Sequence, residues 1–313
     1  MNDLRMFGIV LIVALSACAG GGPWSTVDSN TSDELRDVVA PAPGDAWAIG
    51  LKGAVIHFDG SGWRKSDPGV TEYLRDIHAF AASDVWIVGA AGVVLRWNGS
   101  QWTRLKVPTD HDLTSIWGSS SSDVWVARSP GGTGSESKLL HFNGTTWESR
   151  DSAEDELIER VFGTAANDVW ATEQLSSRIQ HWDGTSWKRM TINGAGGGFL
   201  WNGFWGSGRN DVWLVARDTA NEEAVFFHWD GTSWRRQTLP DDVAATSCEG
   251  LWGSSPTDVW AACSFGRILH YDGMSWRIDQ QEELTRPSLF GIAGSGPDLW
   301  AVGTLGGILH RSR

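Results

Sequence analysis

The sequence has little of what most enzymes and nucleic-acid-binding proteins require. It contains only three cysteines, two tyrosines and four methionines, and the cysteines match no zinc or haem spacing. No G-x-S-x-G, H-E-x-x-H or P-loop motif is present. Lysine and arginine total 25 against 38 aspartates and glutamates, giving a formal net charge of -13. Because nucleic-acid phosphates would repel such a chain, nucleic acid is excluded as a partner.

A long hydrophobic run is also missing. The apolar stretch Met6–Ala17 is too short to cross a bilayer, which needs about 20 residues, but it has the size of a signal-peptide core. Its end, Leu15-Ser16-Ala17-Cys18, resembles the lipobox of bacterial lipoproteins. The resemblance implies a signal peptide over 1–17, acyl chains on Cys18 and stable membrane attachment. Ala19 implies the outer membrane. An ordinary secretory signal and a buried apolar N-terminus are the alternatives.

What the chain has in excess is tryptophan, with 21 copies, and glycine, with 38. The tripeptide Asp-Val-Trp or a near copy recurs seven times, and the steps between its tryptophans are 39, 39, 45, 43, 47 and 40 residues. This is close to the period of a β-propeller blade. The seven tryptophans are Trp47, Trp86, Trp125, Trp170, Trp213, Trp260 and Trp300.

Each copy reads as four short strands. In the second copy they are 74–80, 85–89, 93–97 and 101–107, and the Asn-Gly turn before the last strand suits a tight hairpin. The second and third strands are apolar on both faces, which is typical of a sheet packed between neighbours. Charged residues on the fourth strand suit an outer edge. They are Arg64, Arg104, Lys188, Arg235 and Arg277.

The seventh copy stops at the C-terminus before its fourth strand. A second tryptophan series marks that strand in the other copies: Trp63, Trp102, Trp147, Trp187, Trp234 and Trp276. Trp24 lies 39 residues before Trp63, at the same period. The sequence therefore predicts an all-β, seven-bladed propeller over residues 23–313, closed by an N-terminal strand that joins the last blade. Residues 18–22 form a short tether.

The repeat "DVWIVGAAGVVLRWNGSQW" resembles those of tectonin-like and kelch-like bacterial β-propellers. The resemblance covers residues 23–313 and implies the propeller architecture. It implies little about activity, because propellers include both binding modules and enzymes.

Six histidines occupy one repeated position, and Arg96 replaces them in the second copy. They are His57, His141, His181, His228, His270 and His310. Equivalent residues of different blades are spread around a ring, so they cannot converge on one metal ion. We expect each to make a blade-to-blade hydrogen bond, to a turn aspartate or a backbone carbonyl. The aspartate of Asp-Val-Trp is expected to cap its turn.

Cys248 and Cys263 flank the first hairpin of the sixth blade, roughly opposite each other. An exported compartment permits a disulfide between them. Two free buried thiols are the alternative.

Turn lengths separate the two faces of the predicted ring. Turns between the first and second, and third and fourth, strands are short, whereas connections on the opposite face vary, and binding usually resides in such loops. That face carries acidic residues that are candidates for binding a basic protein partner or Ca²⁺, with solvated loop charge as the alternative. They include Asp110, Asp112, Asp151, Asp155, Glu222, Glu223, Asp241 and Asp242.

Together these features favour a monomeric, membrane-anchored, non-catalytic scaffold that binds a protein through its variable-loop face. No cofactor is expected. A carbohydrate-binding, lectin-like propeller is one alternative, and a hydrolase or lyase acting in the central channel is the other.

Overall fold

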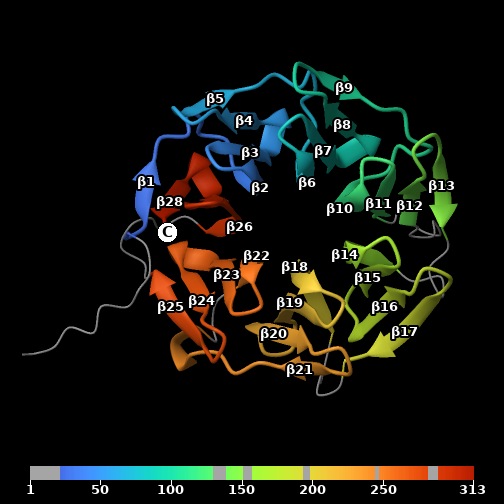
Figure 1. Ribbon diagram of the computed structural model, residues 1–313, viewed down its shortest axis with the longest axis vertical. Coiled ribbons are helices and arrows are strands. Elements are labelled where there is room, and N and C mark those ends of the chain that lie inside the picture. Colours follow the sequence, from blue (N-terminus) through green and yellow to red (C-terminus); the bar gives the residue numbers. More distant parts are fainter. Residues whose placement is uncertain (1–21, 130–138, 151–156, 193–197, 244–246, 281–287) are drawn as a thin grey trace, which may run out of the picture.

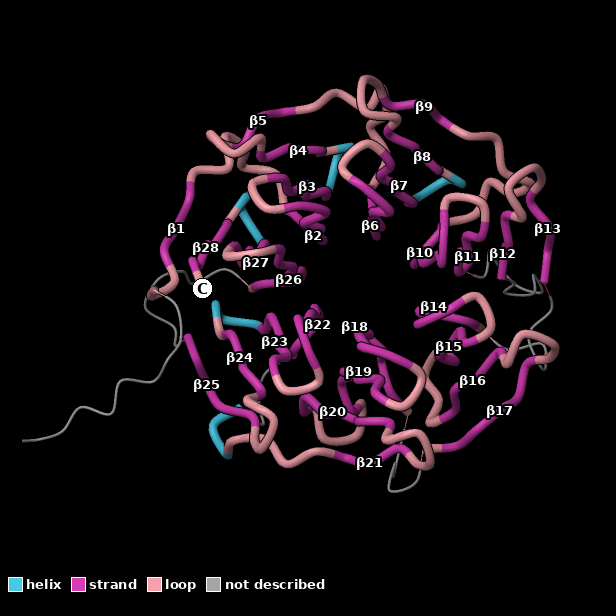
Figure 2. The backbone as a smooth tube through the Cα atoms, in the orientation of Figure 1, coloured by secondary structure: helices cyan, strands magenta, loops and turns pink. Residues whose placement is uncertain are grey.

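The computed structural model describes residues 22–129, 139–150, 157–192, 198–243, 247–280 and 288–313. These residues form seven four-stranded antiparallel sheets arranged as blades in a ring (Figures 1 and 2). The predicted seven-bladed propeller is confirmed. The signal peptide and Cys18 lie outside the described residues.

In blades I–VI the strands follow chain order from the channel outward, and in blade VII the N-terminal strand takes the outermost place. Blade I contains β2 (Leu35–Ala42), β3 (Asp45–Gly50), β4 (Val55–Phe58) and β5 (Trp63–Lys65). Blade II contains β6 (Leu74–Ala81), β7 (Asp84–Gly89), β8 (Val94–Trp97) and β9 (Trp102–Arg104). Blade III contains β10 (Leu113–Ser120), β11 (Asp123–Arg128), β12 (Leu139–Phe142) and β13 (Trp147–Arg150). Blade IV contains β14 (Ile158–Ala165), β15 (Asp168–Glu173), β16 (Arg178–Trp182) and β17 (Trp187–Thr191).

The remaining blades follow the same order. Blade V contains β18 (Phe199–Gly208), β19 (Asp211–Asp218), β20 (Glu223–Trp229) and β21 (Trp234–Arg236). Blade VI contains β22 (Cys248–Ser255), β23 (Asp258–Cys263), β24 (Ile268–Tyr271) and β25 (Trp276–Gln280). Blade VII contains β26 (Leu289–Ser295), β27 (Asp298–Gly303), β28 (Ile308–Ser312) and β1 (Ser25–Val27). The short 3-10 turns are η1 (Leu51–Gly53), η2 (Ala90–Gly92), η3 (Asp241–Val243), η4 (Ser264–Gly266) and η5 (Thr304–Gly306).

The N-terminal strand completes the last blade, as predicted. β1 pairs antiparallel with β28, and Ser25 lies opposite His310 (Figure 1). Trp24 is buried at 3% exposure, with its ring edge-on to Trp260 at 6.1 Å between centroids. Its indole Nε1 donates a hydrogen bond to Asp279 Oδ2 at 2.9 Å, and Arg311 of β28 pairs with the same carboxylate. Blade VI therefore contacts both ends of the chain.

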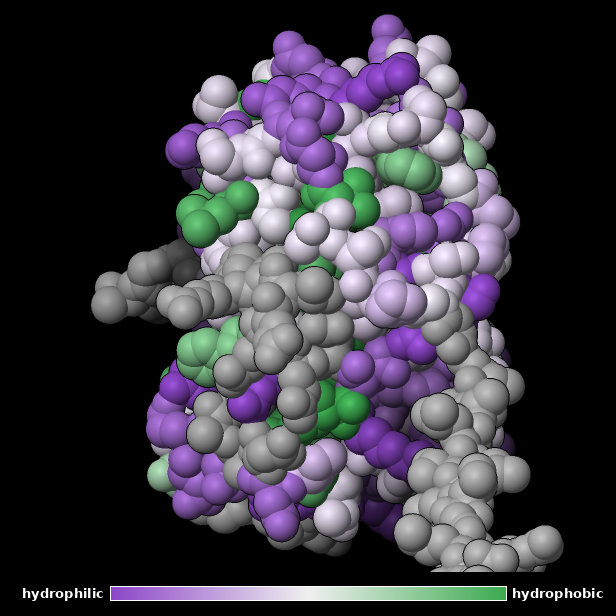
Figure 3. All heavy atoms as spheres, turned by 90° about the vertical axis from the view of Figure 1, so that its left-hand side faces the viewer, coloured by the Kyte–Doolittle hydropathy of each residue, from purple (hydrophilic) through white to green (hydrophobic). Residues whose placement is uncertain are grey.

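The outermost strands carry charge at their exposed positions, as predicted. Arg64 of β5 pairs with Asp59, and Arg277 of β25 pairs with Asp272, both in exposed turns. The wall seen from the side of β1 is mostly polar or weakly polar, with apolar residues in small separate patches (Figure 3). Such side chains discourage edge-to-edge pairing with another sheet.

The repeated histidines do not bridge blades, which corrects the sequence-based expectation. In each case the ring nitrogen Nε2 lies 2.6–2.8 Å from the Asp-Val-Trp aspartate of its own blade. The imidazole also stacks on the tryptophan of that tripeptide, with centroids 3.9–4.2 Å apart. In blade II, Arg96 replaces histidine and contacts Asp84 through Nε and Nη2 at 2.8 and 3.0 Å. The turn aspartate was thus the correct partner, within one blade.

These aspartates make the stability of the fold depend on pH in the acidic range. Burial alone would raise the pKa of Asp123 and Asp211, but hydrogen bonds from His141 and Ser119, and from His228 and Ser207, outweigh it and hold both pKa values below the ordinary range. A carboxylate whose pKa is lower in the folded state stabilises the fold above its unfolded value and loses that contribution as pH falls.

We therefore expect the melting temperature to hold between about pH 7 and 5 and to fall below about pH 4, where unfolded aspartate begins to take up protons. Circular dichroism melts across this range measure it. The variant Asp211→Asn should melt earlier than the wild type at neutral pH and approach it in acid. A wild-type melting temperature that stays constant down to pH 3 would contradict the expectation.

Packing between neighbouring inner strands depends on matched side-chain volumes. A Cβ atom added to Gly253 would lie 2.7 Å from the ring of Trp205 in the preceding blade, and one added to Gly163 would lie 2.6 Å from Trp117. At the same strand position, blades I and II carry Ala40 and Ala79. In the blade that precedes each of these alanines, the position equivalent to Trp205 holds a small residue. Blade VII has Ala293 there, before Ala40 of blade I, and blade I has Val39, before Ala79 of blade II. A large inner residue in one blade is thus matched by a glycine in the next blade, and a small inner residue is matched by an alanine.

We expect Gly253→Ala to destabilise the protein by about 1–3 kcal/mol, because the added methyl group overpacks the contact with Trp205. The double variant Trp205→Val/Gly253→Ala recreates the pairing of Val39 with Ala79. Its loss should therefore be smaller than the sum of the two single losses, as measured by urea unfolding. Additivity within about 0.5 kcal/mol would refute the volume match.

Candidate functional site

The alternating strands place two kinds of connection on opposite faces of the ring. The turns from first to second and third to fourth strand form what we call the short-turn face, and the other connections form the long-loop face. In blades I, II, IV, V, VI and VII the second-to-third connection is four residues long, and in four of them it contains η1, η2, η4 or η5. The expectation that these connections vary widely is therefore wrong for every blade except III, although blade V extends its hairpin through the longer strands β19 and β20.

Three acidic candidates on the long-loop face engage arginines. Asp112 Oδ2 lies 2.7 Å from Arg75 Nη2, and its Oδ1 accepts the Ala91 N–H. Glu222 pairs with Arg217, and Glu223 lies 3.9 Å from Arg236.

The other acidic candidates are more scattered. Asp110 and Asp241 are exposed, and Asp242 belongs to η3. Asp151 and Asp155 lie outside the described residues. Within the described part of the chain, no cluster of three or more His, Cys, Asp or Glu side chains could hold a metal ion. The described candidates thus belong to separate connections around blades II–VI.

The centre of the ring holds a cavity of about 390 Å³, lined by the inner strands of all seven blades. At its long-loop end, residues near the start of these strands supply mostly polar and charged side chains and one aromatic ring. We call this set the channel mouth, and it comprises Arg36, Arg75, Arg160, Asn202, Glu249 and Phe290.

The cations of the channel mouth pair with carboxylates, rings and carbonyl groups. Arg36 Nη2 lies 3.1 Å from Glu249 Oε2, and its guanidinium stands 4.0 Å over the Phe290 ring. Burial raises the pKa of Glu249 although Arg36 acts in the opposite direction. Arg160 donates to the carbonyls of Thr114 and Trp201 at 3.3 and 3.4 Å, and has no ion pair among the described residues.

Two carboxylates meet below the mouth. Asp37 Oδ2 and Asp76 Oδ1 lie 3.2 and 2.9 Å from the same Ile77 N–H. Burial, and then the neighbouring charge of Asp76, raise the pKa of Asp37 well above its ordinary value. Asp76 Oδ2 also accepts the Ile116 N–H at 2.8 Å. The pair therefore ties the inner strands of blades I, II and III together.

The channel becomes aromatic toward the short-turn face. Phe162 and Phe204 of adjacent blades stack with centroids 5.7 Å apart and planes 9° from parallel. Trp117, Trp205 and Trp252 line the same part of the cavity. The cavity thus offers charged groups at one end and aromatic rings at the other.

Sequence reasoning missed the channel mouth. It placed the basic residues mainly on outer strands, yet Arg36, Arg75 and Arg160 lie on the innermost ones. The available signal was the pair Arg-Asp at the start of two inner strands. It went unnoticed because these positions differ from blade to blade, so no period exposes them.

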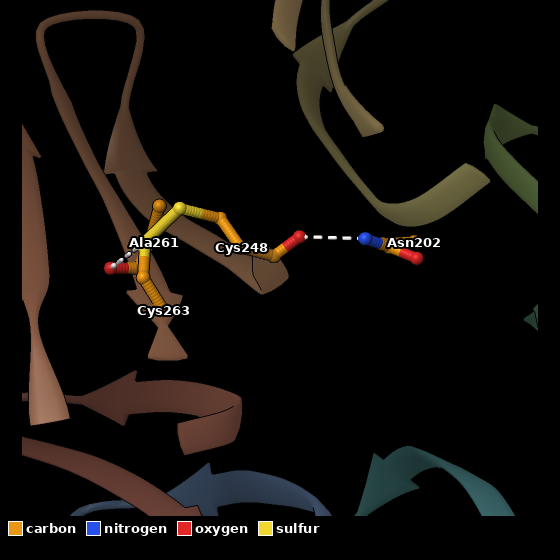
Figure 4. The surroundings of a disulfide bond; sticks show 4 residues. All are labelled: Asn202, Cys248, Ala261 and Cys263. Atoms are coloured by element: carbon orange, nitrogen blue, oxygen red, sulfur yellow. Dashed lines mark hydrogen bonds between the residues drawn. A yellow bond between two sulfur atoms is a disulfide. The ribbon is translucent and has the colours of Figure 1, made fainter. Parts of the chain in front are cut away.

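A disulfide lies directly beside the mouth. Cys248 and Cys263 face each other across β22 and β23, both fully buried, and are joined with Cα atoms 3.9 Å apart (Figure 4). Asn202 of blade V donates to the Cys248 carbonyl at 2.8 Å (Figure 4). Glu249 of the mouth follows Cys248, so the crosslink holds the start of this inner strand.

Comparisons with known proteins identify the fold alone. No protein-family model matches the sequence, and neither does any curated protein. The structure of YCF48 bound to D1 peptide matches 96% of this chain and 100% of its own, with a TM-score of 0.72 and 15% identity. An inactive virginiamycin B lyase from Staphylococcus aureus with quinupristin matches 93% and 99%, with a TM-score of 0.77 and 12% identity. The WD40 propeller domain of Doa1 matches 94% of this chain and 97% of its own, with a TM-score of 0.70 and 11% identity.

The neighbours thus include a propeller with a bound peptide and an enzyme. The described residues contain no helix that is long and apolar enough to span a membrane.

Proposed function

We propose that this protein is a non-catalytic, membrane-anchored scaffold that receives an exposed segment of a partner protein at the channel mouth. The observation that carries the proposal is the cavity itself, whose long-loop end gathers three arginines, Glu249 and Asn202 around an open centre. A concave site with a few polar groups above an apolar interior is the usual form of a binding site. The solved complex of YCF48 with a peptide supports this use of the fold.

The contacts of the charged groups favour binding over catalysis. Asp37 and Asp76 accept backbone N–H bonds from three blades, and Arg36 is paired with Glu249. Such groups position the inner strands. They leave Arg160, which contacts only backbone carbonyls among the described residues, as the cation most available to a partner.

The proposed anchor would orient the mouth away from the membrane. The Gly22 N–H bonds to the Ser312 carbonyl at 2.7 Å, which puts the start of the described chain at the short-turn face. A lipidated Cys18, four residues earlier, would therefore hold that face toward the bilayer.

A random peptide library displayed on phage tests the proposal against purified protein. We expect enriched peptides whose affinity falls about tenfold or more in Arg160→Met, because the half-buried guanidinium lines the cavity and bonds only to backbone carbonyls among the described residues. Arg277→Met is the matched control, since Arg277 lies on the outer strand β25 and its side chain is 63% exposed. Peptides that bind both variants like the wild type, or a library without enrichment, would reject the mouth as the binding site.

A lyase or hydrolase acting in the channel is the second candidate. The observation in its favour is His78, which lies on the same inner strand as Asp76 and lines the same cavity. Burial lowers the pKa of this histidine. Quinupristin, present in the lyase structure, is a direct probe. Conversion of quinupristin by the wild type, detected by mass spectrometry and lost in His78→Gln, would favour the enzyme over the scaffold.

A further inference from the structure

The tips of five second-to-third-strand turns share an unusual backbone conformation, and in blade IV this tip is Leu175, with a φ of 51° and 60% exposure. Lys52, Ala91, Phe265 and Leu305 occupy the middle of η1, η2, η4 and η5 and have left-handed φ values of 58°, 52°, 61° and 58°. In this region the Cβ of an L-residue crowds the following carbonyl, so glycine and asparagine are the favoured residues. For a bulky side chain the conformation is a genuine outlier.

Among the described residues, side-chain burial does not compensate for the bulky tips Phe265 and Leu305, whose turns are held by backbone hydrogen bonds. Phe265 is 55% exposed and Leu305 is 79% exposed, so neither gains the free energy of a buried side chain. Ala91 builds the same turn in blade II with a single methyl group. The turn therefore needs neither the phenyl ring nor the isobutyl group.

These two apolar tips stand in adjacent blades beside the channel mouth. η4 packs against β26, which carries Phe290, and η5 packs against β2, which carries Arg36. The tip of the next blade is Lys52, whose side chain is 77% exposed and pairs with Asp33 at 2.9 Å. An exposed ion pair of this kind contributes little, so its ammonium group can engage a new carboxylate. The three neighbouring turn tips of blades VI, VII and I thus change from apolar (Phe265 and Leu305) to cationic (Lys52).

We propose that Phe265 and Leu305 are the principal contact residues for the bound segment of the partner protein, which presents apolar side chains followed by an acidic residue facing Lys52. This rests on the proposed function and assigns the chemistry of its ligand. Strain kept at an exposed position, where side-chain burial does not compensate for it, is a mark of functional sites. Apolar side chains beside a polar rim are a common form of interface anchor.

Replacement of each tip by asparagine separates binding from folding. Because asparagine tolerates the left-handed region, Phe265→Asn and Leu305→Asn should leave the melting temperature unchanged or raise it. Affinity for the phage-selected peptides should fall about tenfold or more in each variant, since an apolar contact is lost. Ala91→Asn is the matched control, which relaxes the same conformation in blade II and should leave affinity unchanged. Selected peptides should also lose affinity when their acidic residue is replaced by its amide.

The outcomes distinguish this inference from the function on which it rests. Peptides that bind the two tip variants normally but lose affinity in Arg160→Met overturn the inference and leave the channel mouth as the site. A fall in melting temperature in the tip variants also overturns it, because the side chains would then be structural. A library without enrichment, or binding that no variant weakens, overturns both proposals.

Discussion

Replacing Trp24 by alanine is expected to destabilise the protein by about 3–5 kcal/mol, the usual loss for a buried tryptophan. The side chain is buried between the last two blades, where its ring meets Trp260 and its indole N–H donates to Asp279. Its removal leaves a cavity at the seam where the ring closes and leaves a carboxylate with one fewer donor. Urea unfolding followed by tryptophan fluorescence measures the loss.

The neighbouring residue Ser25 is the control for this variant. Ser25 lies on the same strand but its side chain is exposed, so Ser25→Ala should change stability by less than about 0.5 kcal/mol. Deletion of residues 22–27 should go further than either substitution, because it uncovers the edge of β28 to another chain. A deleted protein that stays monomeric in size-exclusion chromatography and melts like the wild type would refute closure by this strand.

Loss of the disulfide is the second large effect that we expect. Cys248 and Cys263 are separated by 15 residues, and closure of such a loop in the unfolded chain contributes about 3 kcal/mol. Alanine suits both buried positions because it leaves no unpaired hydroxyl group in the core. The variant Cys248→Ala/Cys263→Ala should therefore melt well below the wild type in calorimetry.

Reducing agent provides the matched comparison. Dithiothreitol should lower the melting temperature of the wild type toward that of the double variant and leave the variant itself unchanged. If the reductant shifts neither protein, the thiols are already free in solution. A mass difference of two hydrogens before and after reduction reads the bond directly.

The repeat made the fold predictable, whereas the site lacks a repeat. The Asp-Val-Trp period gave the number of blades, and the step from Trp24 to Trp63 gave the closure, because residues that recur occupy equivalent places in every blade. The same spacing could not tell whether His57 bonds within its blade, since the partner aspartate recurs with an identical period. That choice depends on hairpin register.

The channel mouth could not be predicted, because its residues do not recur from blade to blade. Most of its residues occupy one strand position, but they are Arg36, Arg75, Glu249 and Phe290 in different blades, and Arg160 occupies the next position, so they form a set only once the ring brings them together. The left-handed tips were equally hidden, because nothing in "SFG" or "TLG" distinguishes a strained turn from an ordinary loop. Sequence patterns thus describe what the blades share, and function resides where they differ.

The matched volumes of the inner strands bear on how such a chain can change over time. A repeat that is copied within the chain would bring its own inner residue to a new neighbour. A second copy of blade V placed before blade I would press Trp205 against Ala40 rather than against Gly253. A copied blade with a large inner residue is therefore tolerated only where the next blade supplies a glycine, so the seven repeats share a backbone without being freely permutable.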